Sequence, residues 1–151
     1  MKVAYVCMDA GIPAFGSKGC SLHVQEILRE FINRGDEVHL FAVRVDGNPP
    51  RDLKSVKVHR IPVAKATCKE DREQRLIDSN GLLTQQLDRH APFDLVYERH
   101  PLWSDTAMRW AADHDVGSVL EVNAPLIDEQ EAHRHLIRRE VARCMAERSM
   151  R

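Results

Sequence analysis

Residues 16–21 read Gly-Ser-Lys-Gly-Cys-Ser, and they stand between an apolar run, Val3 to Cys7, and an amphipathic segment that starts near Ser21. Glycines let the backbone approach a ligand closely, and the free N–H groups at a helix N-terminus favour an anion. The stretch therefore predicts a strand, a glycine-rich turn and a helix, with a phosphate as the candidate ligand. An interpretation in which Gly16 and Gly19 serve turn geometry alone stays open.

The segments around this turn alternate between strand and helix patterns. Apolar residues recur at helical spacing from Val24 to Ile32, with Ser21 predicted as the cap of this helix and Gly35 as its end. Further strands are expected at 37–43, 56–63, 94–97 and 118–122, and further helices at 69–89, 104–114 and 127–151. Such alternation predicts an α/β fold, a doubly wound, Rossmann-like parallel sheet with Val3 to Cys7 at its centre.

Length and composition narrow the class of protein. A chain of 151 residues, 43% of them hydrophobic, can bury one core, and we expect a Rossmann-like domain over 1–126 followed by a charged helix over 127–151. The 22 basic and 23 acidic residues are spread along the chain, which argues against a nucleic-acid partner. No apolar run approaches the roughly 20 residues of a membrane-spanning helix, although peripheral membrane contact stays open.

Cysteine and histidine spacing gives no sign of a metal or a cofactor. The four cysteines form no Cys-x-x-Cys pair, which is typical of reduced thiols in a cytoplasmic protein. His133 and His135 would face different sides of a helix, so they make a poor metal pair. His39 and His59 lie in predicted strands and are interpreted as packed or solvent-facing. His23, in the first turn of the helix after the glycines, is a further candidate phosphate ligand.

Two other loops are expected to meet the glycine turn. In parallel sheets, ligands bind outside the carboxyl ends of the strands. Residues 98–101 (Glu-Arg-His-Pro) follow one predicted strand, and residues 123–125 (Asn-Ala-Pro) follow another. The carboxylates of Glu98 and Glu121 end apolar strands, where each must be hydrated or paired. Each therefore binds ligand hydroxyls or pairs with Arg99, while Asn123 is either a ligand contact or ordinary turn chemistry.

The glycine turn matches neither of two common phosphate-binding motifs. A P-loop needs Lys and then Ser or Thr directly after its last glycine, and Gly16 is followed by Ser17 before Lys18. The glycines at 11, 16 and 19 also miss the spacing of the dinucleotide fingerprint. A phosphate- or nucleotide-binding module without transfer activity remains an alternative. A dinucleotide-dependent oxidoreductase is a weaker one, because Asp46 lies too far beyond the second strand.

The order of motifs resembles one enzyme family. Residues 16–27 (GSKGCSLHVQEI), with a helix that ends in Arg-Gly-Asp-Glu-Val at 34–38, resemble the opening of the retaining family 4 glycosyltransferases of the GT-B architecture. Residues 94–100 (DLVYERH) and 120–126 (LEVNAPL) are similar to motifs that follow the fourth and fifth strands of that family's N-terminal domain. The resemblance covers residues 1 to about 130 and keeps the motifs in family order.

This resemblance implies the N-terminal, acceptor-side half of a GT-B enzyme that transfers a sugar from a nucleotide-sugar to an acceptor. A donor-binding domain would act in cis or in trans, and the chain alone is expected to be inactive. The implied roles are donor-phosphate binding by Gly16, Lys18 and Gly19, catalysis by His100 or, in another alignment, Arg99, and acceptor binding by Glu98, Glu121 and Asn123. Neither a metal nor a cofactor is implied, and the sequence identifies neither the donor sugar nor the acceptor.

Overall fold

β1 (Lys2–Cys7) lies in the middle of a five-stranded sheet with the order β3-β2-β1-β4-β5, in which every neighbouring pair is parallel. The computed structural model describes all 151 residues. The other strands are β2 (Glu37–Ala42), β3 (Lys57–Arg60), β4 (Leu95–Arg99) and β5 (Gly117–Glu121). The helices are α1 (Gly19–Asn33), α2 (Lys69–Asp78), α3 (Asn80–His90), α4 (Thr106–Asp113), α5 (Leu126–Arg134) and α6 (Arg139–Ser149), with a short 3₁₀ turn at Arg51–Leu53. The predicted fold class and the central position of β1 are confirmed.

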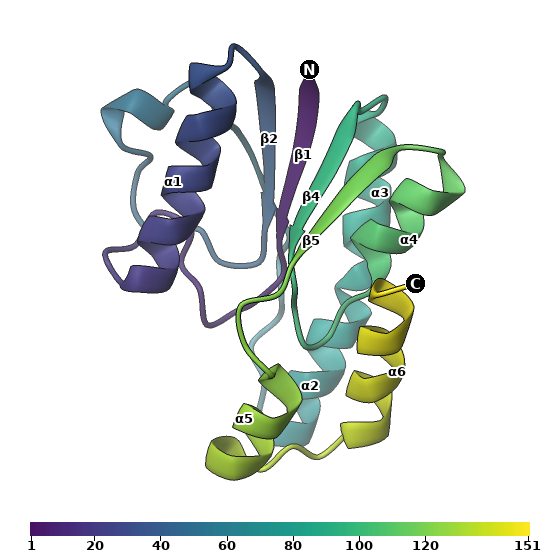
Figure 1. Cartoon of the computed structure of the whole chain (residues 1–151). Coiled ribbons are helices and arrows are strands. Elements are labelled where there is room, and N and C mark those ends of the chain that lie inside the picture. Colours follow the sequence, from purple (N-terminus) through teal and green to yellow (C-terminus); the bar gives the residue numbers. More distant parts are fainter.

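Both faces of β1 are buried, which explains its unbroken apolar sequence. Alternate side chains of the strand, such as Tyr5, pack with Leu28 and the rest of the apolar stripe of α1. The side chains between them, such as Val6, pack with Leu87 of α3 and Trp110 of α4. Figure 1 shows this arrangement, with α1 on one side of the sheet and α3 and α4 on the other.

The structure corrects the start of the first helix. Ser21 was predicted as its cap, but α1 begins at Gly19 and the backbone of Lys18 occupies the cap position, without a side-chain capping bond. Ser21 lies inside the first turn, where its hydroxyl is buried without a hydrogen-bond partner. The end of the helix follows the prediction, because Gly35 has a φ of +83°.

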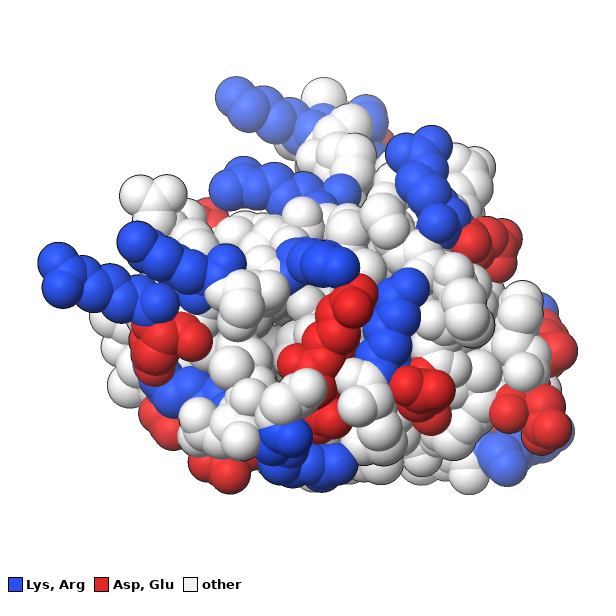
Figure 2. Space-filling view, turned by 90° about the horizontal axis from the view of Figure 1, so that it is seen from above, with Lys and Arg blue, Asp and Glu red and all other residues white.

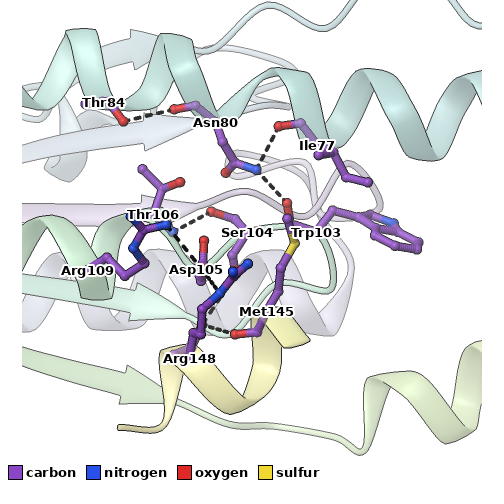
Figure 3. A network of polar contacts seen from close by, with 11 residues as sticks. Ile77, Asn80, Thr84, Trp103, Ser104, Asp105, Thr106, Arg109, Met145 and Arg148 are labelled. Atoms are coloured by element: carbon purple, nitrogen blue, oxygen red, sulfur yellow. Dashed lines mark hydrogen bonds and ion pairs between the residues drawn. The ribbon is translucent and has the colours of Figure 1, made fainter. Parts of the chain in front are cut away.

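The predicted helix at 69–89 is two helices, α2 and α3, that meet at Ser79. The Ser79 hydroxyl donates to the Leu76 carbonyl at 2.6 Å, and the Asn80 amide donates to the carbonyls of Ile77 and Trp103, both at 2.8 Å. These side-chain bonds compete with the regular helical ladder. The contact with Trp103 also ties the junction to the loop after β4 (Figure 3).

The predicted helix at 127–151 is likewise divided, into α5 and α6. Glu73 of α2 accepts hydrogen bonds from the backbone N–H groups of Ile137 and Arg138, at 3.1 and 3.0 Å, just before α6 begins. At the other end of α6, Arg148 forms an ion pair with Asp105 at 2.5 Å (Figure 3). Helix α6 is therefore held at both ends by residues of the sheet domain.

Strand lengths differ from prediction where pairing decides them. The strand expected at 56–63 is only Lys57–Arg60, because its one partner, β2, ends at Ala42, opposite Arg60. Strand β4 extends past Tyr97 to Arg99, because it pairs on both sides, with β1 and with β5. Glu98 and Arg99 are consequently strand residues, not loop residues.

The two edges of the sheet carry different side chains. The outer strand β3 has exposed Lys57 and Arg60, whereas β5 reads Gly-Ser-Val-Leu-Glu and exposes Val119 at 42%.

Acidic and basic side chains are interspersed over the end of the molecule at which the strands begin (Figure 2). None of the helices combines the length and the apolar character that crossing a membrane requires.

Candidate functional site

Three segments predicted to converge do reach the same edge of the sheet. Cys7 at the end of β1 pairs with Arg99 of β4, and Arg99 pairs with Glu121 of β5, so these strands end level with one another. The glycine loop, His100 and Asn123 follow these three ends. The carboxyl edge of β1, β4 and β5 is therefore the candidate site, as the doubly wound topology requires.

The glycine loop is held by the protein around it. The N–H of Phe15 donates to the carbonyl of Val45 at 2.9 Å, which pairs the loop with the segment after β2. The buried side chain of Gln25, in α1, donates to the carbonyls of Ala14 at 3.1 Å and Gly16 at 2.8 Å. Because its backbone is fixed in this way, the loop presents a preorganised surface to a ligand.

The start of α1 offers free backbone donors. The N–H groups of Ser21 and Leu22 both donate to the carbonyl of Lys18, at 2.9 Å. Those of Gly19 and Cys20, the first two residues of the helix, have no acceptor within it. The positive end of the helix dipole and the exposed Lys18 side chain add to the attraction for an anion.

The two glycines of the turn differ in the space around them. A Cβ atom on Gly16 would lie 2.7 Å from Pro13 Cγ and 2.9 Å from Ser21 Oγ, whereas one on Gly19 would have nothing within 4 Å. Gly16 thus packs tightly inside the loop. Gly19 leaves open the space in front of the helix, where an anion would approach.

We expect Gly16→Ala to lower the free energy of unfolding by about 1–3 kcal/mol, the usual cost of overpacking a close contact. Gly19→Ala is expected to leave it unchanged or slightly higher, since alanine is the better helix former. Urea denaturation of the two variants beside the wild type measures both effects. Equal stabilities of the two variants would show that the loop yields at Gly16.

Glu121 is the centre of the polar cluster on the α1 face of this edge. Its carboxylate accepts from Tyr97 Oη at 2.9 Å and from Arg99 at 3.0 Å. His23 of α1 contacts it at 2.8 Å, and the Asn123 amide donates to it as well. Of the two alternatives for Glu121, the structure contains the pairing with Arg99, and acceptor binding stays a prediction. His23 joins the glycine-loop helix to the end of β5.

The cluster keeps Glu121 ionised. Burial alone would raise its pKa, but the hydrogen bonds from Asn123 and Tyr97 and the charges of His23 and Arg99 outweigh burial, so the pKa lies below its ordinary value. Burial and the hydrogen bond to Glu121 raise the pKa of Tyr97 to about 12, which leaves the phenol protonated. The result is a fixed anion surrounded by donors.

Glu98 lies away from the predicted acceptor side. Successive residues of a strand point to opposite faces, so Glu98 points away from the cluster that Arg99 joins. Its side chain is fully buried, and neither carboxyl oxygen has a hydrogen-bond partner. An acceptor cannot reach Glu98 in this structure, and the alternative pairing with Arg99 is absent.

His100 faces a cavity on the side of the sheet opposite the Glu121 cluster. Its side chain is 9% exposed, and it lines a hollow of about 510 Å³ between α6 and the segment after β5. Its Nδ1 atom has no hydrogen-bond partner, and burial lowers the pKa of the ring, which favours neutral imidazole. The backbone N–H of His100 donates to the carbonyl of Glu121 at 2.9 Å, which fixes its place at the edge.

A second cavity at the same edge was not predicted from the sequence. It encloses about 270 Å³ beside the first residues after β1 and is lined by α2 and α5, with Asp9, Arg72, Trp103, Gln130 and Arg134 among its walls. These residues come from separate stretches of the chain. The one sequence signal for this cavity is that residues 8–11, which line it, directly follow β1 at the carboxyl edge of the sheet.

A family model described as Glycosyltransferase Family 4 matches residues 17–148, which is most of the chain. Among curated proteins, none matches.

Solved structures share the fold at low sequence identity. The C-terminal domain of a hydrogenase from Pyrococcus furiosus is similar with a TM-score of 0.56 and 11% identity, over 80% of this chain and 90% of that one. The glycotransferase of kitacinnamycin is similar with a TM-score of 0.51 and 15% identity, over 97% of this chain. The match takes in 38% of that enzyme's length.

The family match includes the start of α1, the Glu121 cluster and His100, and the sheet is that of a GT-B N-terminal domain. The chain belongs to glycosyltransferase family 4.

Proposed function

We propose that this chain is the acceptor-side module of an enzyme that transfers a sugar from a nucleotide-sugar to an acceptor. The observation that carries the proposal is the open start of α1, with free N–H groups at Gly19 and Cys20, next to the Glu121 cluster. An anion site and a set of fixed polar groups at one edge of the sheet suit a donor diphosphate and a hydroxylated substrate.

The glycine turn would hold the donor diphosphate. Gly19 allows close approach, Gly16 fixes the loop, and Lys18 supplies a charge. As the bond from sugar to diphosphate breaks, negative charge grows on the leaving group, and preorganised donors at a helix N-terminus stabilise it without reorganisation. The module would thereby contribute to the chemical step and not to binding alone.

The remaining side chains would position the two sugars. Asn123 is exposed and held by Glu121, so its amide can meet an acceptor hydroxyl in a defined orientation. Glu121 would act chiefly through Asn123 and Arg99, since its oxygens already accept several hydrogen bonds. His100, which lines a cavity, is the better candidate for contact with the transferred sugar, because Arg99 is occupied by Glu121.

Transfer would require a donor-binding domain, in cis or in trans. Closure of two domains over the substrates excludes water and aligns the reacting atoms, and both effects contribute to the rate. The chain spans 38% of the length of the glycotransferase to which it is similar, which supports a second, donor-binding domain outside residues 1–151. We therefore expect no sugar transfer by this chain in isolation.

The test is Gly19→Val in the enzyme assembled with its donor domain. The side chain fits the fold, because nothing lies within 4 Å of the Cβ position, but it obstructs an anion at the helix start. We expect the donor KM to rise about 10-fold or more, since a hydrogen bond to a charged group is worth about 1.5–3 kcal/mol.

Gly81→Val is the matched control. Gly81 also lies in the first turn of a helix with nothing within 4 Å of its Cβ position, yet it belongs to α3. The control should keep the wild-type KM. An unchanged KM in Gly19→Val at unchanged melting temperature would mean that the glycine turn is structural only.

A further inference from the structure

Three histidines far apart in the sequence meet on the α3 face of the sheet. His39 belongs to β2, His59 to β3, and His90 is the last residue of α3. One ring nitrogen from each lies within 4.8 Å of those from the other two. Because α3 ends where the strands begin, this histidine cluster is separate from the glycine turn and Glu121 at the carboxyl edge.

Hydrogen bonds orient the most buried ring. Nε2 of His39 lies 2.8 Å from a carboxyl oxygen of Glu37, and Nδ1 of His39 lies 2.9 Å from Nε2 of His59. A carboxylate only accepts, so Glu37 places the proton of His39 on Nε2 and leaves the lone pair of Nδ1 directed at the cluster. A carboxylate behind a histidine in this way is the usual outer support of a metal ligand.

The surroundings of the cluster are apolar and rigid. The His59 ring stacks on Phe41 at 4.7 Å between centroids, and Phe93 meets His39 edge to face at 5.4 Å. These aromatic contacts hold the rings of His39 and His59 in place, while His59 and His90 remain partly exposed to solvent. Burial lowers the pKa of all three histidines, which favours the uncharged form of the rings.

Two lysines, Lys57 and Lys2, lie close to the cluster, and their positive charges would repel a cation bound there. Lys57 Nζ is paired with Glu37 at 2.7 Å, so its charge is largely compensated. Lys2 donates to the carbonyl of His90 and lies over the Phe93 ring, 5.0 Å from its centroid. Direct bonds from three imidazoles to a metal ion are short range and strong, whereas these ammonium groups act on it only at a distance.

We propose that His39, His59 and His90 bind a divalent transition-metal ion, with Zn²⁺ as the expected occupant. Three neutral imidazoles form a donor set for borderline ions such as Zn²⁺, Co²⁺ and Ni²⁺ and a poor one for Mg²⁺ or Ca²⁺. The fourth position would be open to water. The His59 and His90 rings, 4.0 Å apart between centroids, must turn about their side-chain bonds to direct one nitrogen each at the ion.

The ion would fasten β2 and β3 to the end of α3. At this point the helix meets the two strands through side chains alone, so a common ion would resist their separation. By mass action, a ligand that binds the folded state alone raises the melting temperature as its concentration rises above the dissociation constant. The proposal is independent of the sugar-transfer function, because the histidines take no part in the candidate site.

The experiment is a titration of the metal-stripped chain with Co²⁺ and then Zn²⁺. The starting protein carries Cys68→Ser and Cys144→Ser, since these two exposed thiols would otherwise bind metal. We expect one Co²⁺ per chain, with the visible absorption of a four- or five-coordinate site, displaced by one Zn²⁺. Zn²⁺ should also raise the melting temperature.

Variants of the chain test whether the Co²⁺ absorption and the thermal shift come from this histidine cluster. His59→Gln and His90→Gln, at half-buried positions that tolerate an amide, should abolish the Co²⁺ spectrum and the thermal shift. Glu37→Ala keeps all three histidines and should weaken binding about 10- to 100-fold, the usual loss when the support of a metal-bound histidine is removed. His114→Gln, a histidine outside the cluster, should change nothing.

Two results would overturn the proposal. One is the absence of saturable binding at micromolar metal, which would make the cluster an aromatic packing unit of stacked neutral rings. The other is a spectrum that survives in both His59→Gln and His90→Gln, which would place the metal elsewhere. Circular dichroism of each variant without metal establishes that a lost signal does not come from a lost fold.

Discussion

Glu98→Gln is expected to raise the melting temperature of the protein at pH 8 and to change it little near pH 4. Glu98 is fully buried, and neither oxygen has a hydrogen-bond partner. Burial, and after it the nearby charge of Asp105, raises the pKa of Glu98 to about 8. The folded protein therefore keeps this carboxyl protonated at neutral pH, and glutamine resembles that protonated form in shape and in charge.

The sign of the effect follows from proton binding. In the unfolded chain the pKa of a glutamate is about 4.3, so between that pH and about 8 the native state holds a proton that the unfolded state releases. Stability attributable to Glu98 is thus complete below about pH 4.3 and falls as pH rises through this window, by up to about 1.4 kcal/mol per pH unit. Above the folded-state pKa the penalty is constant. Glutamine does not titrate and carries no such penalty.

Thermal unfolding of wild type and Glu98→Gln across this pH range measures the difference directly. Other groups titrate as well, but their contributions are common to both proteins and cancel in the comparison. Glu30→Gln, at an exposed position, is the matched control and should follow the wild-type curve. Parallel curves for wild type and Glu98→Gln would show that Glu98 is ionised in the folded protein.

Glu121→Leu is expected to lower the free energy of unfolding by about 3–5 kcal/mol, the usual cost of leaving one partner of a buried ion pair. The side chains of Arg99 and Glu121 are only 12% and 13% exposed, so the guanidinium would keep its charge in a site shielded from water. Urea denaturation measures the loss. Glu70→Leu, which breaks the exposed pair with Arg138, should cost about 1 kcal/mol or less.

The double variant Arg99→Leu with Glu121→Leu separates the effect of a stranded charge from that of lost packing. If the stranded charge causes the loss, removing Arg99 as well should restore part of the stability, and the two single effects will not add. Additive losses would mean that Tyr97, His23 and Asn123, and not Arg99, depend on Glu121. Either outcome identifies which donor needs this carboxylate.

Fold class could be predicted from the sequence because a strand buried on both faces must be apolar throughout. Val3 to Cys7 and the stripe from Val24 to Ile32 are compatible with few structures besides a central strand and an amphipathic helix, and the carboxyl edge then follows from the topology. The division at Ser79 was beyond prediction, since it depends on Asn80 meeting the Trp103 carbonyl, a contact across the fold. The local pattern around residue 79 does not indicate such a distant partner.

The sequence predicted at which edge of the sheet the site residues lie, but not the direction in which each side chain points. The order of motifs brought Arg99, His100 and Asn123 to one edge. The burial of Glu98 follows from the extension of β4 to Arg99, and that extension is set by the pairing of Val6 with Glu98 and of Cys7 with Arg99. The histidine cluster has the same origin, because positions 39, 59 and 90 share no regular spacing in the sequence and meet only when three elements pack together.

The unequal edges of the sheet decide where another strand can be added. Any chain that approached β3 would meet the charges of Lys57 and Arg60, which disfavour pairing with a neighbour. At β5 the residues Gly117, Ser118 and Val119 carry no charge. Because β5 is an outer strand, the N–H and C=O groups on its open side are available to hydrogen-bond with another strand. Addition of a further strand to this sheet is therefore favoured at β5 and disfavoured at β3.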